Sequence, residues 1–175
     1  MRPLRADEIE VRVGQVYDGA CTMLLYKNAR VDMALLDELS GPMGWQRVHK
    51  NINGVMYCGV GVYDDASGHW VWKWDAGTES NTEKEKGAAS DSFKRACVNW
   101  GIGRELYTAP RIKFEVATVQ KKNGYGYELA NKWEFYGLEV SHIMTEEING
   151  VLTITELTLT QKGHTVYSYT KGDKR

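Results

Sequence analysis

The 175-residue sequence has few cysteines, few prolines and no excess of charge of either sign. The three cysteines, Cys21, Cys58 and Cys97, are far apart, so neither a CxxC zinc motif nor a disulfide framework is expected. The four histidines are equally scattered, and no two have the spacing of metal ligands on one helix. The sequence therefore predicts neither a metal site nor a cofactor.

Long apolar runs are also missing. No segment approaches the roughly 18 to 20 apolar residues that a membrane span needs, and segment 1–8 is acidic before any apolar run begins, unlike a secretory signal. We therefore expect a cytoplasmic protein without a membrane partner. The composition, 42% hydrophobic, is that of one folded domain over 1–175, with a core over 9–110, further strands over 111–170 and a short disordered tail at 171–175.

The charge balance argues against a surface coated with cations. The chain has 22 basic and 23 acidic side chains, and residues 51–100 alone carry 5 basic and 7 acidic ones. A polyanionic partner would therefore have to be held by a few well-placed cations.

Hydrophobic periodicity and turn dipeptides predict most of the elements. Apolar residues at helical spacing predict helices over 29–39, ended by Gly41-Pro42, and over 82–101. Segment 121–131, with two glycines, is predicted to be a mobile loop. Alternating residues predict strands over 9–17 and 20–27 (a hairpin around Asp18-Gly19) and a three-stranded meander over 45–76. Further strands are predicted over 111–119, 133–143, 151–160 and 164–170, with turns at Asn149-Gly150 and Lys162-Gly163.

The helix over 82–101 gives the strongest local signal. Thr82 and Glu85 form a capping box, and Gly101 supplies the stop. Its apolar residues form one stripe that should face a sheet. The fold class is therefore α+β, an antiparallel sheet of a β-hairpin and a β-β-β meander with one long helix packed across it. Cations lie in the second half of the helix, although Arg95 could simply pair with Asp91 one turn earlier.

A row of tryptophans marks the last strand of the meander. Trp70, Trp72 and Trp74 alternate with His69, Val71 and Lys73, so the indoles share one face. Nucleic-acid bases could stack on such a row. Tryptophans at this spacing more often form the core beneath a helix, and this is the interpretation we adopt.

Motifs for catalysis are largely missing. The chain has no phosphate-binding glycine loop and no GxSxG elbow. Carboxylates and lysines between Asp75 and Lys86 could hold Mg²⁺ in a nuclease, but no lysine lies two residues after an acid, as restriction-type nucleases require. A metal-dependent nuclease and an oligomeric β-rich scaffold without nucleic-acid binding remain alternatives to a non-enzymatic nucleic-acid-binding protein.

Two sequence blocks carry a family resemblance. The run GTESNTEKEKGAASDSFKRACVNWGIGRELY at 77–107 resembles the signature helix of the Rad52/Rad22 single-strand annealing family, and is most similar to its short bacterial and phage (DdrA-like) members. The block YKNARVD at 26–32, followed by LDE at 36–38 and GPMGWQ at 41–46, agrees with it. The resemblance covers residues 24–110, with the meander between the two blocks.

The resemblance implies binding and annealing of single-stranded DNA in break repair and recombination, without ATP or enzymatic chemistry. It implies rings or arcs of subunits that bind the strand in a groove, with Lys94 and Arg95 on the DNA backbone. Arg30 is the expected third contact, whereas a further arginine of eukaryotic members is replaced here by Val98. Expected partners are single-stranded DNA, further copies of the chain, and an exonuclease or a single-strand binding protein in a bacterial or phage-infected cell. Weaker DNA-binding candidates in or beside the matched blocks are Lys86, Arg47, Lys50 and Arg104.

Overall fold

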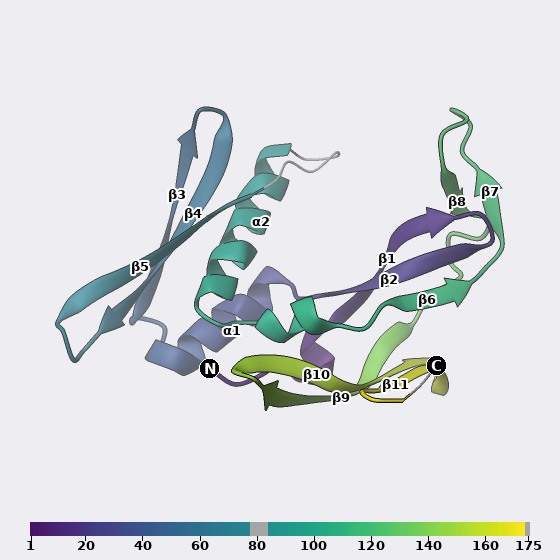
Figure 1. The fold of residues 1–175 in the computed structure, drawn as a ribbon. Helices are drawn as coiled ribbons and strands as arrows, with labels where there is room; N and C mark the ends of the chain where they lie inside the picture. The colour runs from purple at the N-terminus through teal and green to yellow at the C-terminus, as the bar shows by residue number, and fades with distance from the viewer. Residues whose placement is uncertain (78–83, 174–175) are drawn as a thin grey trace. The chain divides into compact units, whose positions relative to one another are not determined.

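The computed structural model describes residues 1–77 and 84–173, with the side chains of 84–86 left out. Antiparallel sheets and two α-helices make up the described chain (Figure 1), which confirms the α+β class. Neither helix in this part has the length and apolar character to cross a bilayer. The chain forms two compact units, which we call unit 1 (Met1–Pro3 and Lys27–Arg104) and unit 2 (Leu4–Tyr26 and Glu105–Arg175).

Unit 1 contains both α-helices and one sheet. The Asn28 side chain accepts hydrogen bonds from the amides of Arg30 and Val31, and Gly41 ends the first helix at a φ of 73°, as predicted. The elements are α1 (Ala29–Ser40), β3 (Trp45–Ile52), β4 (Val55–Asp64), β5 (His69–Ala76) and α2 (Lys84–Asn99).

The predicted meander is confirmed as an antiparallel sheet in the order β3-β4-β5. Helix α2 contacts β4 and β5, and it buries Phe93, Ala96 and Cys97 completely or nearly so. The Trp100 indole N–H donates to the Val60 carbonyl at 3.0 Å, which fixes the end of the helix on the central strand. The predicted capping box of this helix lies outside the described residues.

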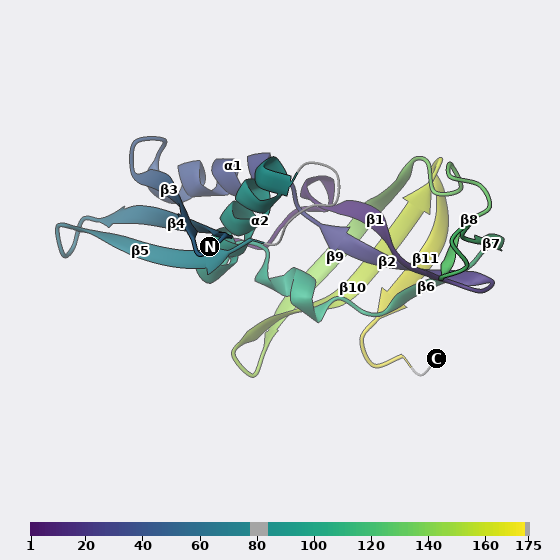
Figure 2. The ribbon, with the colours of Figure 1, turned by 90° about the horizontal axis from the view of Figure 1, so that it is seen from above.

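Unit 2 is built almost entirely of strands (Figure 2). Its sheets have the orders β1-β2-β6, β11-β10-β9 and β7-β8. Phe114 lies 6.3 Å from Tyr167 between ring centroids, so the first two sheets share a core. The elements are η1 (Ala6–Glu8), β1 (Glu10–Tyr17), β2 (Ala20–Tyr26), η2 (Arg104–Thr108), β6 (Ile112–Glu115), β7 (Thr118–Gln120), β8 (Tyr127–Leu129), β9 (Leu138–Ile148), β10 (Val151–Gln161) and β11 (His164–Thr170).

Turn dipeptides located the hairpins of unit 2 correctly. The predicted Asp18-Gly19 turn joins β1 to β2. The predicted Asn149-Gly150 turn has positive φ angles of 52° and 77°. The predicted Lys162-Gly163 turn has positive φ angles of 51° and 80°. These left-handed pairs close the β9–β10 and β10–β11 hairpins.

Two predictions in unit 2 were wrong in extent. The strand expected over 133–143 begins only at Leu138, because Asn131 accepts a hydrogen bond from the Trp133 amide and turns the chain. The strand expected over 111–119 is interrupted, since β6 ends at Glu115 and β7 begins at Thr118.

The segment 121–131 is not entirely a loop. Its residues Tyr127–Leu129 form β8, which pairs with β7. Gly124 and Gly126, at φ of 76° and 78°, allow the tight turn between the two strands. The mobility of the segment stays a prediction.

Candidate nucleic-acid interface

A buried ion pair joins the start of α1 to the middle of α2. Lys27, 6% exposed, donates through Nζ to a carboxylate oxygen of Asp32, which is fully buried. The same Nζ donates to the Lys94 carbonyl at 3.2 Å. This side chain therefore fixes the backbone of α2 at the residue expected to contact DNA.

Burial sets the protonation of this cluster. It raises the pKa of Asp32 from 3.8 to about 6, against the opposing effect of Lys27 and of the nearby Lys94 ammonium. The pKa of Cys97 is raised well above its ordinary value by burial and by the adjacent Asp32 carboxylate, so this thiol stays protonated. Cys97 is thus a buried structural residue, as are Cys21 and Cys58.

Lys94 and Arg95 are adjacent cations in the second half of α2, and the Lys94 carbonyl accepts a hydrogen bond from this cluster. Lys94 is half-buried, and the Arg95 side chain is 47% exposed. Arg95 Nε lies 3.3 Å from Oδ1 of Asp75 on β5, a partner that helical spacing does not indicate. Ion pairs at the surface contribute about 1 kcal/mol or less, so this contact alone holds the Arg95 side chain only weakly.

Arg30 is an exposed residue in the first turn of α1. It lies three residues after Lys27, whose Nζ reaches the Lys94 carbonyl. The structure thus brings the three principal candidates, Arg30, Lys94 and Arg95, onto two helical segments that share one buried contact.

The weaker candidates are distributed differently. Arg47 faces α2, with its guanidinium carbon 4.7 Å from the centre of the buried Phe93 ring. Lys50 lies on the opposite face of the same strand, because side chains alternate along β3. The Lys86 side chain lies outside the described part of the chain.

Arg104 is engaged by the protein itself. Its Nε and Nη2 donate to the carbonyls of Val98 and Asn99, each at 2.9 Å. These are among the carbonyls that lack an intrahelical partner at the end of α2. The geometry therefore gives Arg104 a capping role at this helix end.

Comparison with known families decides the identity of the chain. A family model of Rad52/22 double-strand break repair proteins matches residues 1–125. The chain belongs to the Rad52/22 family. No curated protein and no solved structure gives a significant match. The Rad52/22 match includes all of unit 1 and ends before β9, which agrees with the region of strongest resemblance.

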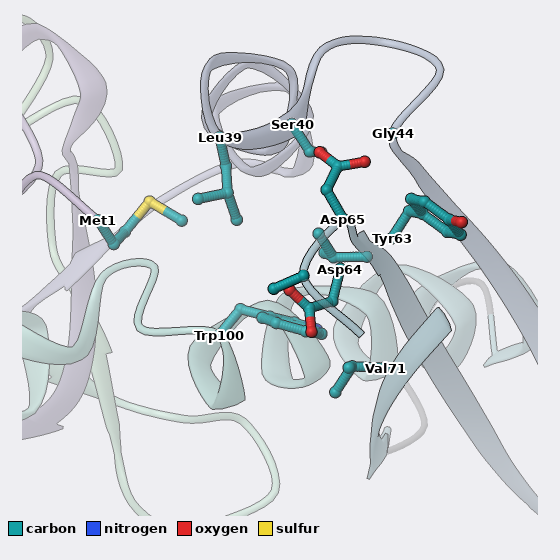
Figure 3. A pocket seen from close by; sticks show the side chains of 11 residues that line it. Met1, Leu39, Ser40, Gly44, Tyr63, Asp64, Asp65, Val71 and Trp100 are labelled. Carbon is teal, nitrogen blue, oxygen red and sulfur yellow. The ribbon is translucent and has the colours of Figure 1, made fainter. Parts of the chain in front are cut away.

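One pocket of unit 1 contains two aspartates and is lined by Leu39 and Ser40 at the end of α1. Asp64 and Asp65 line it where β4 ends and the chain turns toward β5 (Figure 3). Ser40 and Trp100 line it from the two helix ends. The Asp64 pKa is lowered by its hydrogen bond to Ser67, so this carboxylate is ionised. Among the described residues that line the pocket, no lysine, arginine or histidine side chain faces the two aspartates, so the pocket differs from the cationic surface that this Rad52/22 chain presents on α2.

The tryptophan row is the main error of the sequence interpretation. Lys73 Nζ lies 4.3 Å from the centre of the Trp100 ring, and Asp75 pairs with Arg95 of α2. The positions of β5 that face α2 are therefore those of Val71, Lys73 and Asp75, and not those of the tryptophans. The indoles are on the other face of the sheet and are not a core beneath the helix. Alternation predicted which residues share a face, but the choice of face depends on packing between distant segments.

Sequence analysis also missed Lys27 and Asp32 as parts of the site. They lie five residues apart, and Lys27 precedes the helix, so no helical spacing links them. Both belong to the 26–32 block that carries the Rad52/22 resemblance. The resemblance of that block was the signal in the sequence that pointed to these two residues.

Proposed function

We propose that this Rad52/22 chain binds single-stranded DNA and anneals complementary strands without ATP, in repair of double-strand breaks and in recombination. The observation that carries the proposal is the buried Lys27 contact. It holds the start of α1 and the backbone of Lys94 together within the family match. This contact pre-organises Arg30, Lys94 and Arg95 as phosphate ligands.

Annealing requires only binding energy from the protein. Pairing of complementary strands is favourable by itself, so no nucleotide hydrolysis and no nucleophile is needed. Cations that neutralise phosphates reduce the repulsion between two strands, and an extended strand keeps its bases available. Arg95 can exchange Asp75 for a phosphate, and Lys94 and Arg30 add two further charges.

Assembly into a ring or arc is part of the proposal. Three cations per subunit give weak binding, but a strand that crosses several subunits sums their contributions. We assign the chain to the short bacterial and phage members on the strength of the quoted blocks. The corresponding location is the cytoplasm of a bacterial or phage-infected cell, with an exonuclease or a single-strand binding protein as partner.

A fluorescence annealing assay with complementary oligonucleotides, without ATP and with EDTA, tests the proposal. Annealing in EDTA supports it. Loss of strands that depends on Mg²⁺ would instead support the nuclease, and an inert protein would support the scaffold. The variant Lys94→Ala/Arg95→Ala should anneal more slowly while its oligomeric mass is unchanged.

The matched control is Lys121→Ala/Lys122→Ala. It also removes two adjacent cations, from exposed positions between β7 and β8. We expect annealing by this variant to equal that of the wild type, because the loss of activity follows from position and not from net charge.

A further inference from the structure

The sheet of unit 1, as far as the structure describes this unit, has an aromatic face with exposed rings, opposite the face that contacts α2. We call it the tryptophan face. His49 Nε2 lies 3.1 Å from the Ala89 carbonyl of α2, which marks the covered face at β3. Alternation therefore places the following side chains on the tryptophan face: Gln46, Val48, Lys50, Ile52, Val55, Tyr57, Tyr63, Trp70, Trp72 and Trp74.

Two glycines allow the indoles to lie flat on this sheet. Trp74 is paired with Gly59 and Trp72 with Gly61 across β4 and β5. A Cβ added to Gly59 would lie 2.5 to 2.7 Å from three atoms of the Trp74 ring, so a face of the ring, not its edge, covers the glycine. The opposite face of such a ring points away from the sheet.

The rings form one continuous row along the edge strand β5. Centroid distances are 5.5 Å from Tyr63 to Trp70, 6.5 Å from Trp70 to Trp72 and 6.0 Å from Trp72 to Trp74. Trp70 and Trp74 are each 38% exposed, and Tyr63 is 40% exposed. Three large rings therefore offer surface to a ligand within the described part of the chain.

The charge of this face suits an anion. Lys50 Nζ lies 4.9 Å from the centre of the Trp74 ring, and it is the one charged side chain of the face defined above. The carboxylates of the same strands, Asp64 and Asp75, occupy positions of the opposite face. A cation beside a row of open aromatic rings is the combination that binds single-stranded nucleic acid.

We propose that the tryptophan face binds the bases of single-stranded DNA by stacking on Trp70 and Trp74, with a phosphate on Lys50. This inference rests on the proposed function and adds a contact surface distinct from Arg30, Lys94 and Arg95. Stacking occupies the face of a base and leaves its pairing edge open. A strand held in this way remains available to its complement, which phosphate contacts alone do not ensure.

The test compares two oligonucleotides of equal length, thirty deoxythymidines and thirty abasic deoxyribose phosphates. Wild-type protein should bind the thymidine strand more tightly, because only that strand has bases to stack. In the variant Trp70→Leu/Trp74→Leu, the ratio of the affinities for the thymidine and abasic strands should fall by roughly five-fold or more for each ring removed. Its salt dependence of binding should be unchanged, since the phosphate contacts remain.

The control Trp133→Leu removes a tryptophan that is 74% exposed in unit 2. It should keep the wild-type preference for the thymidine strand. A tryptophan-face variant with intact preference would overturn the inference. If the variant keeps the preference but its oligomeric mass, measured by sedimentation, is changed, the inference is also overturned. The tryptophan face would then bind a second copy of the chain and not DNA.

A cross-linking experiment on the wild type avoids any folding defect of the variant. A bromodeoxyuridine oligonucleotide is irradiated with the protein, and the adducts are mapped by mass spectrometry. Adducts at Trp70 or Trp74 support the inference, and adducts confined to other aromatic residues contradict it. Failure of the proposed function is distinguishable, because the protein would then bind neither oligonucleotide.

Discussion

Lys27 and Asp32 show how single residues can position a binding site without touching the ligand. Both side chains are buried, and one ammonium serves the Asp32 carboxylate and the Lys94 carbonyl. A buried pair of this kind often adds little net stability, but removal of one partner leaves an uncompensated charge. Its value here is therefore the fixed geometry between α1 and α2.

Lys27→Met should be strongly destabilising for this reason. We expect the free energy of unfolding at pH 7 to fall by about 3–5 kcal/mol, measured by urea denaturation. Arg12→Met is the matched control, because Arg12 pairs with Glu10 on the surface of β1. The control should lose less than about 1 kcal/mol. Equal effects of the two substitutions would contradict the account.

The raised pKa of Asp32 predicts a pH dependence of stability. Its folded pKa of about 6 exceeds the ordinary 3.8, so the folded state binds this proton more readily than the unfolded state. The contribution of Asp32 to stability should therefore fall as the pH rises from about 4 to about 6. The slope for one proton is at most about 1.4 kcal/mol per pH unit.

Asp32→Asn removes the titrating group while it keeps an acceptor for Lys27. Urea denaturation of this variant between pH 4 and pH 7 should lack the falling component that the wild type shows. Identical profiles for the two proteins would mean that Asp32 does not titrate in this range.

At the scale of elements, helix α2 depends on contacts at its end. The Arg104 guanidinium donates to two carbonyls there, and the Trp100 indole donates to β4. These contacts assign a structural role to Arg104, which its position in the matched blocks had made a weaker candidate for a DNA contact. The two roles make different predictions.

Arg104→Ala should lower stability more than DNA affinity. Loss of two hydrogen bonds at the end of α2 should cost about 1–2 kcal/mol, measured as a shift of the urea midpoint. The affinity for single-stranded DNA, measured by fluorescence anisotropy, should stay within about two-fold of the wild type at a temperature where both proteins are folded. A large loss of affinity with unchanged stability would reverse this assignment.

The elements also show what could be predicted from the sequence. Gly41 and the Lys162-Gly163 turn were located correctly, because these residues have local backbone preferences. The start of β9 and the face of the sheet on which Trp72 lies were not predicted correctly. Both depend on contacts between segments that are distant in the chain. Of the candidate site, the cations were identified from the family blocks, whereas the Lys27 contact with α2 required three-dimensional structure.

At the scale of the whole molecule, near neutrality and DNA binding are compatible. The net charge is −1, and the proposed contacts are confined to a few residues of unit 1. Such a chain should bind a long strand only when several copies act together. Non-specific attraction to polyanions should be weak.

Binding should therefore depend on assembly. The protein is diluted through the concentration at which the proposed oligomer dissociates, and the dissociation is followed by mass photometry. The affinity for a thirty-nucleotide strand should then fall by roughly ten-fold or more, because the effective concentration of linked sites is lost. Equal affinity of isolated subunits and oligomers would show that repetition of the site is unnecessary.

The central claim is that phosphates lie on Lys94 and Arg95. Its most direct test is the salt dependence of single-stranded DNA affinity for the wild type and for Lys94→Ala/Arg95→Ala. Each lost phosphate contact reduces the slope of log affinity against log salt by about 0.7, so the variant should bind more weakly with a slope shallower by about 1.4. The change of 1.4 applies to each subunit that the strand contacts, because every subunit of the variant loses both cations. An unchanged slope and affinity in a variant with intact oligomeric mass would contradict the claim.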